Sequence, residues 1–164
     1  MSWSSSRRGA LIAMLSVFAL AGCTIAPVHG DRVDISTDPL PLAYASPDSR
    51  LEQVFYQALA ARLGTSGALD APLVTANVSA SASRIGLSSR IEPATDYQVV
   101  ATVNYRVEKL GEIIASGRRT ATAAYRTTGQ IVADDAARQN ASEEAVRAAA
   151  QSVTATLLAD PALR

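Results

Sequence analysis

The sequence predicts an α+β domain: a two-layer sandwich with a four-stranded, mostly antiparallel sheet, two helices on one face, and the element order β-α-β-β-β-α. Three observations lead to this class. Two segments carry apolar residues at every third or fourth position, as amphipathic helices do. Other segments alternate apolar and polar residues, as half-buried strands do. Since each helix and each strand has one apolar face, placing both helices on one side of the sheet covers all of these faces together.

The first strand is expected in the stretch "DRVDIST", residues 31–37. Val33 and Ile35 share one face of this stretch, and polar residues occupy the other. That period of two is typical of a strand with one buried face. The next stretch, "DPLPLAYASP", contains three prolines and is expected to be a loop.

The clearest helix lies in "SPDSRLEQVFYQALAARLG", residues 46–64. Ser46 is expected to cap it, and Pro47 suits a first turn. Gly64 stands where a left-handed residue would end the helix. One face should be buried, because the apolar residues recur at helical spacing: Leu51, Val54, Phe55, Ala58, Leu59 and Leu63.

Three more strands are expected. "PLVTANVSASASR", residues 72–84, alternates strictly, which favours a strand over a flexible serine–alanine linker. Residues 85–95, with Gly86 and Pro93, predict a hairpin region or an irregular strand entrance. "DYQVVATVNYRVEK", residues 96–109, and residues 112–126 alternate on either side of Leu110-Gly111, which predicts a long hairpin with one apolar face.

The final element predicted is an alanine-rich helix, "VADDAARQNASEEAVRAAAQSVTATLLADP". Its mostly small residues form a narrow stripe that would let the helix axis approach the sheet closely, and Asp160-Pro161 should end it. The stripe consists of Ala137, Ala141, Ala145, Ala149, Val153 and Leu157.

The N-terminal part has the order of a secretory signal peptide. Arg7 and Arg8 precede an almost uninterrupted apolar run, and small residues close it. The run is short for a bilayer-spanning helix, which needs about 20 apolar residues. "LAGC", ending at Cys23, resembles the lipobox of bacterial lipoproteins, in which the cysteine sulfur receives a diacylglyceryl group before cleavage. We therefore expect a signal peptide over residues 1–22, a lipidated tether over 23–31 and one α+β domain over 32–164.

The composition excludes several classes of function. Without Arg7 and Arg8 the chain has 13 basic and 15 acidic residues, a net charge of about −2, so it does not suggest a nucleic-acid partner. The single histidine, His29, falls in the tether, and the single cysteine is expected to be lipidated. The acidic pairs Asp134-Asp135 and Glu143-Glu144 are typical of a solvated helix face. The sequence therefore predicts no enzyme, no metal site and no cofactor.

Arginine side chains offer a possible binding surface. Basic residues cluster in the second half of the predicted sheet, and Arg106 and Arg118 could lie on its polar face. Together with Arg119 they could contact an anionic partner such as phosphorylated lipid A, or a partner protein. Ordinary solvated strand charges are the alternative.

The lipobox, followed by this order of elements, resembles the lipopolysaccharide-assembly lipoprotein family, LptE. The resemblance rests on "LAGCTIAPVHG", "RLEQVFYQALAARL", "DYQVVATVNYRV", "GEIIASGRRTATAAY" and the alanine-rich final helix. It implies a lipoprotein of the outer membrane, facing the periplasm or inside a partner barrel. That partner would be the large β-barrel that inserts lipopolysaccharide, which the protein would plug and help to assemble; some members also bind lipopolysaccharide.

Two alternatives belong to other classes. The chain could be an auxiliary periplasmic lipoprotein of an ABC-type lipid transporter, or a free-standing ligand-binding or envelope-stress lipoprotein. Both would also have a lipobox and an α+β domain.

Overall fold

A computed structural model of the protein describes residues 42–85 and 94–163. The predicted signal peptide, Cys23, His29 and the predicted strand over residues 31–37 lie outside the described residues. Most of the predicted hairpin region over residues 85–95 does so as well.

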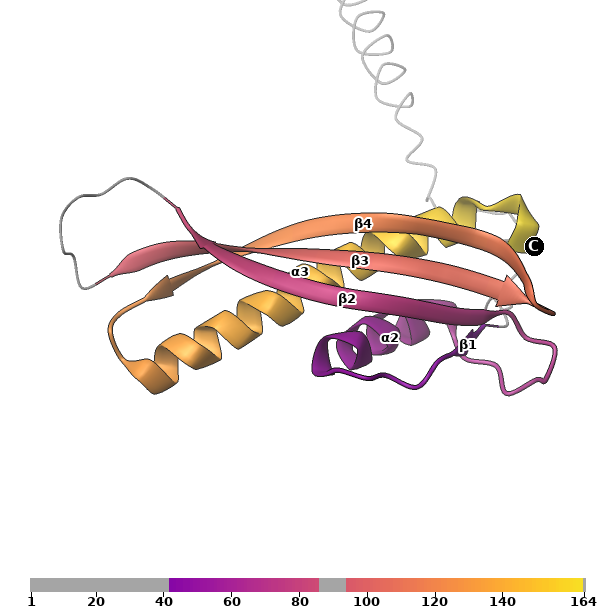
Figure 1. The fold of residues 1–164 in the computed structure, drawn as a ribbon, viewed down its shortest axis with the longest axis horizontal. Helices are drawn as coiled ribbons and strands as arrows, with labels where there is room; N and C mark the ends of the chain where they lie inside the picture. Colours follow the sequence, from indigo (N-terminus) through magenta and orange to yellow (C-terminus); the bar gives the residue numbers. More distant parts are fainter. Residues whose placement is uncertain (1–41, 86–93, 164) are drawn as a thin grey trace, which may run out of the picture. The chain divides into compact units, whose positions relative to one another are not determined.

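The described residues form one four-stranded sheet with two helices on one side (Figure 1). Its strands are β1 (Ala43–Tyr44), β2 (Leu73–Arg84), β3 (Thr95–Lys109) and β4 (Glu112–Thr127), in the spatial order β1-β2-β3-β4. Strand β1 runs parallel to β2, and the other pairs are antiparallel. The predicted α+β class and element order are confirmed.

Strand β1 corrects one sequence prediction, because it lies in the stretch expected to be a proline-broken loop. It has only two residues, and backbone contacts hold it: the Ala43 amide donates to the Pro72 carbonyl at 2.9 Å, and the Ala45 amide donates to the Val74 carbonyl at 3.0 Å. The Tyr44 hydroxyl donates to the Gly64 carbonyl at 3.0 Å. Burial raises the pKa of Tyr44 to about 12.

Strands β3 and β4 form the long hairpin that the alternation predicts. Leu110 and Gly111 connect them with φ angles of 52° and 83°, and two positive φ values are characteristic of a type I′ turn. The register shifts once, between Val107 and Glu108. The serine–alanine segment in β2 pairs with β3 along its whole length, so it is a strand and not a linker.

The first helix, α2 (Arg50–Leu63), begins later than predicted. Its N-cap is Ser49 instead of Ser46: the Ser49 hydroxyl accepts the Glu52 amide at 3.2 Å, and the Glu52 carboxylate accepts the Asp48 amide at 2.8 Å. This reciprocal pattern is close to a capping box, which satisfies otherwise free amides of the first turn. Gly64 ends the helix with a φ of 78°, as predicted.

The second helix, α3 (Ile131–Ala159), crosses the sheet beside α2, and a short 3-10 turn, η1 (Pro161–Leu163), follows it (Figure 1). Most of its predicted small-residue stripe is buried. Ala145 and Ala149 have no exposed surface, and these small side chains let α3 lie close to the sheet. The core between the layers is formed by Phe55 and Leu59 of α2, Val153 and Leu157 of α3, and the valines of the strands.

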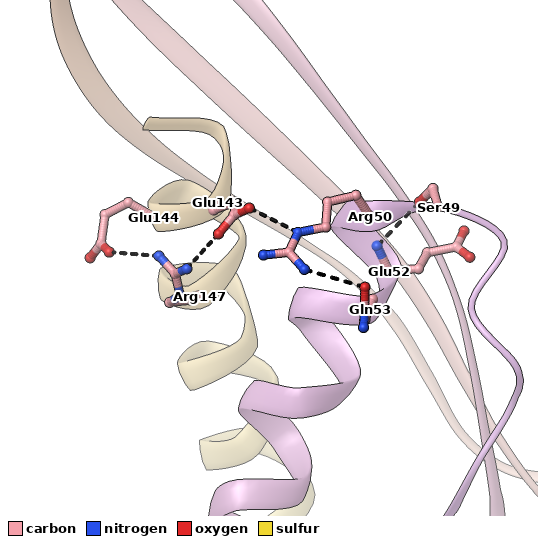
Figure 2. Close-up of polar contacts among 7 residues, drawn as sticks. All are labelled: Ser49, Arg50, Glu52, Gln53, Glu143, Glu144 and Arg147. Atoms are coloured by element: carbon pink, nitrogen blue, oxygen red, sulfur yellow. Dashed lines mark hydrogen bonds and ion pairs between the residues drawn. The ribbon is translucent and has the colours of Figure 1, made fainter. Parts of the chain in front are cut away.

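A polar network joins the N-terminal end of α2 to the middle of α3 (Figure 2). Arg50 donates from Nε to the Glu143 carboxylate at 3.0 Å, and Arg147 donates to the same carboxylate at 2.6 Å. Arg147 also lies 3.5 Å from Glu144. Exposed ion pairs contribute about 0–1 kcal/mol each, so the network orients the helices more than it stabilises them.

Beyond the end of β1, a side chain of α2 supplies a hydrogen-bond partner for the backbone at the outer edge of β2. The Ala76 amide donates to the Tyr56 hydroxyl at 2.9 Å, and that hydroxyl lies 3.4 Å from the Ala76 carbonyl. Tyr56 therefore occupies the place that a longer β1 would fill. This contact fixes α2 against the edge of the sheet.

Candidate functional site

The sheet face opposite the helices is a polar surface built by three strands, and we call it the open face. It is formed by the strand residues that alternate with the buried core residues and therefore point away from the helices. They are exposed or partly exposed. The open face consists of Thr75, Asn77, Ser79, Ser81 and Ser83 of β2, Gln98, Val100, Thr102, Asn104 and Arg106 of β3, and Ser116, Arg118, Thr120, Thr122 and Ala124 of β4.

The open face presents hydroxyl and amide groups in rows across three strands. One row joins Ser79, Thr102 and Thr120, and the next row joins Asn77, Asn104 and Arg118. Hydroxyls and amides both donate and accept hydrogen bonds. The surface is therefore suited to polar groups such as sugars, phosphates or the polar wall of another protein.

Two of the three arginines predicted to bind lie on the open face. Arg106 forms an ion pair with Glu108 at 2.7 Å, and its side chain remains half exposed. Arg118 stands opposite Asn104, in the row next to that of Arg106. Such diagonal positions are about 7–8 Å apart. Within the described residues, the Arg118 side chain has no ion pair or hydrogen bond, so its guanidinium donors are available to a partner.

The third predicted arginine, Arg119, lies on the helix side of the sheet. Its guanidinium donates to the Thr156 hydroxyl of α3 at 2.9 Å and to the Arg118 carbonyl at 3.0 Å. Arg119 also lines a shallow depression with Thr156 and Pro161. Because successive strand residues point to opposite faces, Arg118 and Arg119 cannot contact one ligand on the open face together.

At the other end of the open face, Arg126 and Asp96 form a two-point ion pair, with nitrogen–oxygen distances of 2.7 and 3.0 Å. The hydrogen bonds from Arg126 lower the pKa of Asp96, and those same bonds raise the pKa of Arg126. Both side chains are exposed, so the ion pair lies in solvent. This arginine is already matched by a carboxylate, so the unmatched positive charge of the open face centres on Arg118.

The sequence indicated the arginines and a polar sheet face rich in serine and threonine, but not which hydroxyls and amides align in a row with each arginine. The polar positions of the alternating patterns in β2 and β3 could have identified these hydroxyls and amides. Which of them lie side by side depends on the register of the strands. Across residues 42–85 and 94–163, no cluster of three histidine, cysteine, aspartate or glutamate side chains could hold a metal ion. No helix in these ranges is long and apolar enough to cross a membrane.

Known proteins share this fold. A proposed lipoprotein from Caulobacter crescentus has a TM-score of 0.62 at 18% identity, with 79% of this chain and 96% of that one covered. A minor lipoprotein from Acinetobacter baumannii has a TM-score of 0.54 at 19% identity, covering 74% of this chain and 94% of that one. Rare lipoprotein B from Shewanella oneidensis has a TM-score of 0.50 at 14% identity, covering 73% of this chain and 92% of that one.

Among sequences, no curated protein shows significant similarity to the chain. The family model described as "LptE: Lipopolysaccharide-assembly" matches residues 37–157. The match includes β1, α2, the three long strands and α3 as far as Leu157.

Proposed function

Because the chain belongs to the lipopolysaccharide-assembly family LptE, we propose that it is an outer-membrane lipoprotein that partners and plugs the lipopolysaccharide-inserting β-barrel. In this proposal Cys23 carries the lipid anchor and becomes the first residue of the mature chain. The protein acts by position and by contact instead of by catalysis. The observation that carries the proposal is the family match over nearly all of the described residues.

The open face supports this role. A plug inside a water-filled barrel does not need the apolar surface that a lipid-facing protein needs, and its contacts can be polar and hydrated. The hydroxyl and amide rows of β2, β3 and β4 supply such a polar surface. Strands of 12 to 16 residues make the face long, about 40–50 Å at 3.3 Å per residue.

The same face offers a place for phosphate groups of lipopolysaccharide. Among residues 42–85 and 94–163 no acceptor meets the Arg118 guanidinium, and Arg106, whose side chain is half exposed, lies one row away. Arginine is suited to phosphate because its planar fork donates two parallel hydrogen bonds. We propose Arg106 and Arg118 as the contact residues for lipopolysaccharide or the barrel. Arg119, which bonds to Thr156, would support α3 instead.

Detergent extraction and affinity purification of the full, lipidated chain test the proposed function. We expect an outer-membrane β-barrel protein to co-purify in stoichiometric amount, and depletion of the chain to lower surface lipopolysaccharide. Recovery of inner-membrane transporter subunits alone would favour an auxiliary role in lipid transport and would contradict the proposal.

Lipopolysaccharide contact is tested by reversing charges on the open face. Arg106→Glu together with Arg118→Glu should weaken lipopolysaccharide binding by about tenfold or more. Arg62→Glu together with Arg138→Glu, at exposed positions of α2 and α3 on the helix side, changes the net charge by the same amount and serves as the control. Equal affinity for the double variant and the unaltered chain would remove lipopolysaccharide contact from the proposal.

A further inference from the structure

Exposed apolar side chains gather at the end of the sheet where β3 turns into β4. Leu110 is 87% exposed in that turn, and Ile113, which follows it, is 53% exposed. Leu73 begins β2 in the same row of the sheet as Glu108 and Ile113. Leu69, which is fully exposed, lies in the loop that leads from α2 into β2. We call these four residues the apolar tip.

Leucine at position 110 is unfavourable for two separate reasons. Its φ of 52° is a left-handed conformation, which costs an L residue with a Cβ about 1–2 kcal/mol and is favoured by glycine, asparagine and aspartate. An asparagine before Gly111 would form the preferred type I′ pair. Solvent exposure also disfavours a leucine here. The fold of the described residues buries little of this side chain against a neighbouring element, which leaves it free to contact a surface outside the domain.

The route of the chain shows what lies near the apolar tip. Strand β1 is parallel to β2 and pairs with Leu73 and Val74, so the residues before it join the domain at the end where β2 begins. That junction is firmly held, because Leu42 is buried and its carbonyl accepts the Ser66 amide at 2.8 Å. The apolar tip is therefore the end of the domain to which Cys23 is connected.

Once Cys23 is lipidated, the length of the connection sets an upper limit on how far this end can lie from the membrane. Residues 24–41 span at most about 60 Å when fully extended. This argument rests on the lipid anchor of the proposed function, although the apolar tip itself does not depend on the β-barrel.

We propose that the apolar tip is a membrane-docking surface that inserts its leucine and isoleucine side chains into the lipid headgroup region around the anchor. Acidic side chains outnumber basic ones near the tip, since Asp70, Glu108 and Glu112 stand against Arg106 and Lys109. The recognised surface is therefore the apolar boundary of a bilayer and not its anionic charge. The lipid anchor is one contact with the membrane and the apolar tip is a second. Together they orient the domain with the β3–β4 turn toward the bilayer.

The test uses the mature chain with Cys23→Ala, so that no lipid anchor contributes, and mixed phosphatidylethanolamine–phosphatidylglycerol vesicles. Leu110→Asn in this background should raise the melting temperature, because it relieves the left-handed leucine. It should also lower the vesicle partition coefficient about tenfold, the effect expected for losing one inserted leucine. A purely structural role for Leu110 would not produce these opposite changes.

Val132→Asn is the matched control, because Val132 is 84% exposed but lies in the first turn of α3, outside the apolar tip. It should leave the partition coefficient unchanged. The proposal is overturned if the Cys23→Ala chain does not bind vesicles, or if the Leu110 and Val132 variants bind equally. Leu110-dependent self-association without vesicle binding would also overturn it, by assigning the tip to a second copy. None of these results bears on co-purification with a β-barrel.

Discussion

Removing the hydroxyl of Tyr56 tests how the sheet edge is closed. Tyr56→Phe keeps the ring, which lies 5.7 Å from Phe55 and 6.0 Å from Tyr44 between centroids. The change leaves the buried Ala76 amide without its 2.9 Å acceptor. A buried donor left without a partner costs about 1–3 kcal/mol. The 3.4 Å contact to the Ala76 carbonyl is too long to add much.

For a domain of this size, 1 kcal/mol corresponds to about 3–5 °C in melting temperature. Tyr56→Phe should therefore lower it by roughly 3–15 °C in thermal unfolding followed by circular dichroism. Amide hydrogen exchange at Ala76 should become faster. Tyr105→Phe is the control, because Tyr105 is also buried but its hydroxyl has no hydrogen bond within the described residues. Equal melting temperatures for the two variants would refute the role assigned to Tyr56.

Three further substitutions test other parts of the structure. Tyr44→Phe should cost stability at neutral pH, where the Tyr44 hydroxyl donates to the Gly64 carbonyl. Because the folded-state pKa of Tyr44 is raised to about 12, the unaltered chain loses stability between pH 10 and about 12, and the difference between the two chains should shrink there. Denaturant unfolding across this pH range measures the difference. Gly117→Ala should cost about 1–3 kcal/mol, because its Cβ would lie 2.9 Å from the Tyr105 hydroxyl oxygen. In a Tyr105→Leu background the same change should cost much less, and an undiminished cost would contradict the contact. Ala149→Leu should cost a similar free energy of unfolding by overfilling the contact between α3 and the sheet, and an unchanged melting temperature would show that this contact is loose.

The long elements could be predicted from the sequence because their patterns repeat many times. Strand β3 alternates over 15 residues, and the buried stripe of α3 recurs along most of its 29. Strand β1 could not be found in this way, because two residues show no period and backbone bonds to Pro72 and Val74 hold them. Similarly, Ser46 and Ser49 both suit a helix cap, and the choice depends on which hydroxyl meets the Glu52 amide.

The candidate site was predictable in part. The adjacent residues Arg118 and Arg119 must point to opposite sides of a strand, and Arg119 shares the parity of Ala121 and Ala123, which pack against the core. The alternation alone could thus have separated them. The alignment of Arg118 with Asn104 depends on the register, and the register follows the Leu110-Gly111 turn and the shift after Val107. The left-handed conformation of Leu110 is likewise visible only in the structure.

The central claim is that the open face meets the partners of this lipoprotein in the outer membrane. Photo-cross-linking in living cells from position 102, where Thr102 occupies the middle row of the open face, tests it most directly. We predict an adduct with the lipopolysaccharide-inserting β-barrel, or with lipopolysaccharide itself. The absence of both adducts, or an adduct with inner-membrane transporter subunits alone, would contradict the claim.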